Sequence, residues 1–181
     1  TRQVRLAEWR GPGDTGAVVG EGLTARVGER TLFADVDVRL EPGGVLVIEG
    51  EHAQRRALLL ALAGRVKLTG GTLKVLGHVL PEEAPVVRGL APVLGPSVTH
   101  FGRVLTRQVG GLVCVDDADE LSETQDRSLR RALAASAVAG ADSPITWVLG
   151  VLPGSELESQ LPVPFQVLKL PSHLALEGAT R

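Results

Sequence analysis

Residues 45–64 constrain the fold more than any other part of the sequence. Residues 45–48 are an uninterrupted apolar run, which is typical of a strand buried on both faces of a parallel sheet. Residues 53–63 are strong helix formers, and Gly64 stands where a left-handed glycine would end a helix. Because this helix is apolar on nearly all sides, we expect it to be buried. The segment therefore predicts a strand and a helix inside an α/β core.

The rest of the chain extends this alternation of strands and helices. A second buried strand is predicted at residues 112–115, and Asp116 and Asp117 follow it directly. Ser122 and Gln125 have the spacing of a capping box, which predicts a helix over residues 122–139. Further strands are predicted at 72–76, 86–91, 145–151 and 163–168, with a weak helix at 98–108. The order of elements indicates an α/β fold.

The part before this core has a different pattern. Short β-like runs occupy residues 17–40, broken by Gly28 and ended by the sequence Pro-Gly-Gly at 42–44. We expect a single domain with a mainly parallel sheet flanked by helices and an N-terminal antiparallel β-subdomain. Its predicted parts are an irregular opening segment at 1–16, the β-subdomain at 17–44, the α/β core at 45–170 and a tail at 171–181.

Composition excludes several classes of function. The 19 basic and 21 acidic residues give a net charge of −2, without the basic patch that nucleic acid binding requires. The longest strongly apolar run, residues 58–63, is far too short to span a membrane, so no direct membrane insertion is expected. Cys114 is the only cysteine, so no intrachain disulfide can form and a cytoplasmic location is expected. We interpret Cys114 as a buried apolar residue, and the four histidines share no spacing of metal ligands.

The predicted strand, turn and helix at 45–63, followed later by a strand that ends in two acids, match the plan of a P-loop NTPase. In that plan, backbone N–H groups of a glycine-rich turn wrap around phosphates and a lysine neutralises the terminal phosphates. A Ser or Thr hydroxyl and a distant acid hold Mg²⁺.

The sequence resembles the ATP-binding subunits of ABC transporters over roughly residues 22–169. The string GERTLFADVDVRLEPGGVLVIEG is similar to the opening β-region of that family, and LLLALAGRVKLTGGTLKVLGH to its first helix and the following hairpin. GLVCVDDADEL is similar to its Walker B strand. The resemblance implies a P-loop NTPase fold, with ATP and Mg²⁺ as the cofactors of active members.

The phosphate loop departs from the family pattern G-x-x-x-x-G-K-[ST]. Gly50 matches the first position, but Arg55, Arg56 and Ala57 stand where glycine, lysine and a hydroxyl are expected. Arg55 would place a long side chain where the backbone curls against phosphate, and Ala57 cannot coordinate Mg²⁺. Arg56 keeps the positive charge without the compact shape of lysine. We expect this arginine pair to be solvated or paired with carboxylates rather than engaged with phosphate.

Most of the remaining positions of the family pattern also lack the expected residues. Asp116 matches the Walker B aspartate and is the candidate Mg²⁺ ligand, whereas Asp117 replaces the catalytic glutamate and is one methylene shorter. The stacking aromatic, the Q-loop glutamine and the switch histidine should fall near Val27, Val93 and Leu152, and none is present. Only residues 93–115 lie between Pro92 and Asp116, which leaves no room for the helical subdomain with its LSGGQ-type signature.

Three hypotheses follow for the function. The first is a pseudo-ATPase that binds a membrane-embedded transporter subunit, a competent ABC ATPase partner or a second copy of itself, and reaches the membrane only through that partner. The second is a slow ATPase that uses Arg56, Asp116 and Asp117 in altered roles with ATP and Mg²⁺. The third is an unrelated α/β fold that acts on a small molecule at the carboxyl ends of its strands.

Overall fold

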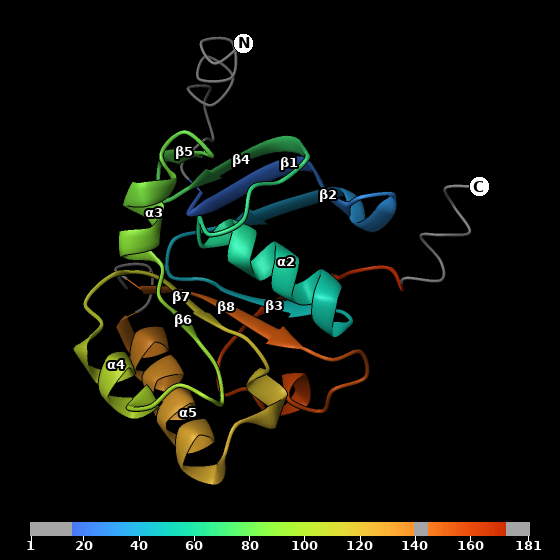
Figure 1. Ribbon diagram of the computed structural model, residues 1–181. Helices are drawn as coiled ribbons and strands as arrows, with labels where there is room; N and C mark the ends of the chain where they lie inside the picture. Colours follow the sequence, from blue (N-terminus) through green and yellow to red (C-terminus); the bar gives the residue numbers. More distant parts are fainter. Residues whose placement is uncertain (1–15, 140–144, 173–181) are drawn as a thin grey trace.

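The computed structural model describes residues 16–139 and 145–172. Two β-sheets enclose helix α2 (His52–Leu62), and two further helices cover the other face of the second sheet (Figure 1). The predicted irregular opening segment lies outside the described residues except for its last residue, and so does the tail from residue 173 onward.

The first sheet is antiparallel and has the strand order β2-β1-β4-β5. Its strands are β1 (Val18–Val27), β2 (Arg30–Leu40), β4 (Gly70–Val75) and β5 (His78–Leu80). β1 and β2 form a hairpin whose turn includes Gly28, with a φ of 62° that favours glycine. The expected antiparallel β-region therefore exists, but two of its four strands follow α2 in the sequence.

The second sheet is parallel throughout and has the order β6-β7-β8-β3-β9. Its strands are β3 (Val45–Glu49), β6 (Val93–Leu94), β7 (Gly111–Val115), β8 (Ile145–Val151) and β9 (Gln166–Lys169). The central strands are continuous apolar runs because helices or strands cover both of their faces. This sheet confirms the predicted mainly parallel α/β architecture.

Alternate residues of each central strand contribute to two separate cores. In β3, Leu46 and Ile48 belong to the core that α2 fills between the two sheets. Val45 and Val47 belong to the core beneath α4 (Phe101–Arg107) and α5 (Glu123–Ala139). The period of two along a strand fixes this division. As a result α2 is held between the sheets, with its first turn at the carboxyl ends of the parallel strands.

The predicted strand at residues 86–91 is wrong, because the chain forms helix α3 (Ala84–Leu90) there. Pro85 lies in the first turn, where its fixed φ favours a helix start. Val87 is buried, whereas Val86 remains 45% exposed, so the segment covers the core with a single face. A short apolar run does not distinguish these two structures.

Other local predictions are confirmed with adjusted boundaries. The Ser122 Oγ accepts a bond from the Gln125 N–H at 3.2 Å, and the Ser122 N–H donates to Gln125 Oε1 at 2.9 Å, which is the reciprocal capping box before α5. The weak helix predicted at 98–108 is α4. The last strand begins at Gln166, later than predicted.

Every residue between β6 and β7 is described, and α4 is the only helix there. The chain thus has one short helix at the place where the resemblance implies a helical subdomain. Within 16–139 and 145–172, no helix combines the length and the apolar character that crossing a bilayer requires.

Candidate functional site

The candidate site lies at the carboxyl edge of the parallel sheet, where β3 and β7 end on either side of β8. Gly50 follows β3, and Asp116 and Asp117 follow β7. Arg55 and Arg56 reach the same place from the first turns of α2. The structure therefore brings together all five residues that the sequence singled out.

The turn between β3 and α2 is short. Helix α2 begins at His52 with Glu51 as its N-cap, so only Gly50 and Glu51 separate it from the strand. The Arg55 N–H donates to the Glu51 carbonyl at 2.9 Å, which places residues 52–55 in a regular helical turn. The Gly50 N–H pairs with the carbonyl of Val151 at 3.1 Å. The segment aligned with a phosphate loop is therefore mostly helix.

Arg55 is the centre of the site and is completely buried. Its Nε donates to Asp116 Oδ1 at 2.9 Å, and its Nη1 donates to the Gly50 carbonyl at 3.2 Å. Its Nη2 donates to Asp117 Oδ1. Because a buried guanidinium requires compensating charge and acceptors, these three contacts explain why Arg55 tolerates burial.

Arg56 supplies the second cation. Its Nη1 donates to Asp116 Oδ2 at 3.2 Å, and its side chain is 47% exposed. Each oxygen of the buried Asp116 carboxylate therefore accepts from a different arginine. Two carboxylates face two guanidinium groups, which balances the charge. Both arginines are paired with carboxylates, as expected, although Arg55 is not solvated.

Asp117 lies at the rim of the site, and its side chain is 23% exposed. Its φ of 51° and ψ of 43° are in the left-handed region, which turns the chain sharply into the 3₁₀ turn Ala118–Glu120. His52 Nδ1 is 3.7 Å from Asp117 Oδ1 and 3.4 Å from Arg55 Nη2. His52 thus belongs to the site, although spacing alone gave no reason to select it.

A metal ion would need atoms that Arg55 already contacts. His52, Asp116 and Asp117 offer ligand atoms that all lie within 4.8 Å of one another. However, Arg55 donates to one oxygen of each carboxylate and lies beside the imidazole. In this arrangement the Arg55 guanidinium supplies the positive charge beside both carboxylates.

Gly150 is a further component that the sequence analysis missed. A Cβ at this position in β8 would lie 2.7 Å from Asp116 Oδ1 and 3.0 Å from Arg55 Cδ. Only glycine leaves room for the ion pair against the strand. The signal was present, because a glycine inside an otherwise apolar buried strand marks close approach of another group.

The other positions that the resemblance implied contribute no functional side chain here. Ala57 lies in α2, half-buried. Val27 is 66% exposed at the end of β1, and Leu152 is 40% exposed directly after β8. The Leu152 N–H donates to Asp119 Oδ2 at 3.1 Å.

Cys114 and Glu158 have shifted pKa values and lie outside the cluster formed by Arg55, Arg56, Asp116 and Asp117. Burial raises the pKa of the Cys114 thiol to about 12, with Arg65 opposing the shift, so this cysteine is the inert core residue that the sequence predicted. Burial raises the pKa of Glu158, and hydrogen bonding and repulsion from Glu49 add to this effect, whereas Lys169 opposes it.

The fold is similar to that of solved ATP-binding subunits of ABC transporters. It matches cbiO1 from Clostridium perfringens, part of the ABC transporter complex cbiONQ, with a TM-score of 0.57 and 8% identity over 76% of this chain and 79% of that chain. It matches an ATP-binding subunit of an ABC transporter with a TM-score of 0.61 and 12% identity over 85% of each chain. No family model and no curated protein matches the sequence. The likeness confirms an ABC ATPase-like fold.

Proposed function

We propose that this chain is a non-hydrolysing ABC ATPase-like subunit with a regulatory or structural role. Its partner is a membrane-embedded transporter subunit or a competent ATP-binding subunit. The observation that carries the proposal is the buried guanidinium of Arg55, which bonds to both acids of the candidate nucleotide site.

The first argument concerns phosphate binding. A phosphate loop presents several free N–H groups from a backbone that curls around the anion. Here the corresponding residues form a helical turn, and the Arg55 N–H is bonded to the Glu51 carbonyl. The backbone therefore does not fit the phosphate groups of a nucleoside triphosphate.

The second argument concerns magnesium. Asp116 would have to coordinate Mg²⁺, but both of its oxygens accept hydrogen bonds from arginines. Entry of Mg²⁺ would expel the Arg55 guanidinium from its acceptors, and an unpaired buried charge is strongly unfavourable. Ala57 offers no hydroxyl in compensation. The residues present therefore do not fit Mg-ATP.

The proposed kind of partner is inferred from the similarity of fold. The neighbour cbiO1 is named as part of an ABC transporter complex. The similarity of fold is the ground on which we propose an equivalent place for this chain in such a complex. We accordingly propose a cytoplasmic location at the inner face of the membrane, reached through the partner. A homodimer is the alternative assembly.

A slow ATPase is the second candidate function. Asp116, Asp117 and the half-exposed Arg56 remain together at one edge of the sheet, and His52 adds a titratable group. This alternative predicts Mg²⁺-dependent ATP turnover that is lost in Asp116→Ala and in Asp117→Ala.

Nucleotide binding separates the two candidates. Thermal shift and calorimetry would compare millimolar Mg-ATP with ATP without magnesium on the purified chain. A ligand at 100 times its dissociation constant stabilises a protein by about 2.7 kcal/mol, which is easily measured. We expect no shift in either condition. A magnesium-dependent shift that disappears in Asp116→Asn would contradict the proposal and favour the slow ATPase.

The partner requires its own measurement. The tagged chain, expressed near its native level, would be purified from detergent-solubilised membranes and from the supernatant. We expect it to co-purify with a transporter subunit or an ATP-binding subunit. Recovery of the chain alone from both fractions would count against a role as a subunit.

A further inference from the structure

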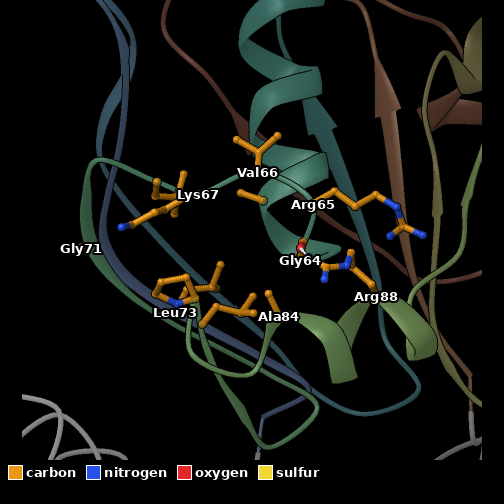
Figure 2. Close-up of a pocket in the computed structure, with 12 residues that line it drawn as sticks. Gly64, Arg65, Val66, Lys67, Gly71, Leu73, Ala84 and Arg88 are labelled. Atoms are coloured by element: carbon orange, nitrogen blue, oxygen red, sulfur yellow. Dashed lines mark hydrogen bonds between the residues drawn. The ribbon is translucent and has the colours of Figure 1, made fainter.

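A pocket lies at the C-terminal end of α2, remote from Arg55 and Asp116. Its volume is about 230 Å³, and it is enclosed by the C-terminal end of α2, the following loop, β4, β5 and the start of α3. Figure 2 shows the pocket between Val66 on one side and Leu73 and Ala84 on the other. It shares no lining residue with the candidate nucleotide site.

Three cations and no carboxylate line this pocket. Arg65 and Lys67 come from the loop after α2, and Arg88 comes from α3. None of the three forms an ion pair within the described residues. The C-terminus of α2 contributes the equivalent of about half a negative charge, which three full positive charges outweigh. The pocket is therefore electropositive in a chain whose net charge is −2.

Two of the cations are held in place by the backbone. Arg65 Nη1 donates to the carbonyls of Ala63 at 3.0 Å and Ala91 at 2.6 Å. Arg88 Nη1 donates to the Gly64 carbonyl at 3.2 Å, and Figure 2 shows its guanidinium lying against Gly64. Each guanidinium has five N–H donors, so Arg88 retains donors for an incoming anion, whereas Arg65 extends away from Leu73 in Figure 2 and contributes its charge alone. Because these side chains are already held in place, binding of a ligand costs less side-chain conformational entropy.

The rest of the pocket is apolar. Leu73 and Leu80 are almost completely buried and form part of its floor, and Ala61 is buried beside them. In Figure 2, Lys67 and Arg65 extend in opposite directions from the loop, so the charges flank the apolar surface. A ligand that matches this arrangement has a short apolar body and one anionic end.

We propose that this pocket binds a small amphipathic anion, with a carboxylate or a phosphate monoester as the head group. Arg88 receives the head group, Lys67 and Arg65 supply the surrounding positive charge, and the leucine floor receives the apolar body. The volume is below the range of about 300–1,000 Å³ that is typical of drug-sized ligands, which favours a short chain or a single ring.

Octanoate and octyl phosphate are suitable probes, with octanol as the uncharged control and acetate as the anion without an apolar body. Titration would be followed by calorimetry and by backbone amide NMR shifts on the full chain. At the efficiency of ordinary ligands, about ten non-hydrogen atoms correspond to a dissociation constant of roughly 6 mM. We expect octanol and acetate to bind at least about tenfold more weakly than octanoate. The ratio of octanoate to octyl phosphate affinity identifies the preferred head group.

Three variants test the assignment. Arg88→Gln and Lys67→Gln should each weaken octanoate binding about tenfold. Arg103→Gln, at an exposed position of α4, is the matched control and should leave binding unchanged. Lys67 has no hydrogen bond in the described structure, so its variant stays informative if Arg88→Gln unfolds. The proposal is overturned if octanol binds as tightly as octanoate, if the control weakens binding equally, or if neither anion binds at ~10 mM.

Discussion

Replacing Arg55 with methionine tests whether the buried ion pair organises the site. Methionine keeps the apolar stem and removes the guanidinium, together with its bonds to Asp116, Asp117 and the Gly50 carbonyl. Asp116 then stays buried with Arg56 as its remaining charged partner. Removing one partner from a buried pair costs about 3–5 kcal/mol, and we expect the lower part of that range because Arg56 remains.

The control is Arg56→Met, which removes a cation from the same carboxylate. Because the Arg56 side chain is 47% exposed, its pair is screened by water and should contribute no more than about 1 kcal/mol. Urea unfolding of both variants measures the difference, with an unchanged m-value as evidence that the comparison is valid. The double variant Arg55→Met with Asp116→Asn should recover at least about 1 kcal/mol, because it also removes the negative charge of the buried Asp116 carboxylate.

Equal losses of stability in the two single variants would refute this reasoning. They would mean that water reaches Arg55 and that its complete burial does not describe the protein in solution. A stabilised Arg55→Met variant would refute it more strongly, because desolvation of the pair would then exceed its attraction.

Two further predictions concern glycine packing and the cysteine. Gly150→Ala places a Cβ against Asp116 and Arg55 and should lower the free energy of unfolding by about 1–3 kcal/mol, measured by thermal unfolding. The control Gly89→Ala in α3 should be neutral or stabilising, because a Cβ added there would have no neighbouring atom within 4 Å. Equal effects of the two substitutions would contradict the predicted contact. Cys114 should resist alkylation near pH 8 in the native chain and react readily in denaturant, because burial raises its pKa to about 12 and keeps the thiol protonated. Rapid labelling of the native chain would show that the strand opens.

The sequence determined the features that depend on neighbouring residues. The apolar run at 45–48 and the helix formers that follow it predicted β3 and α2, because burial on both faces leaves no polar position in the pattern. Ser122 and Gln125 predicted the start of α5, since their reciprocal bonds span three residues. The pair Asp116-Asp117 was correctly placed at the end of a buried strand.

Only the tertiary structure decided how these pieces form a site. Arg55 and Asp116 are 61 residues apart, and no local pattern distinguishes a buried arginine from a solvated one. The pair forms because α2 starts immediately after β3 and because Gly150, on the adjacent strand, leaves space for both side chains. The prediction for α3 failed for the same reason, because packing against the core, and not the short apolar run itself, decided between a helix and a strand. Burial and charge compensation depend on contacts between distant segments, so the sequence supplied the residues and the fold decided which of them meet.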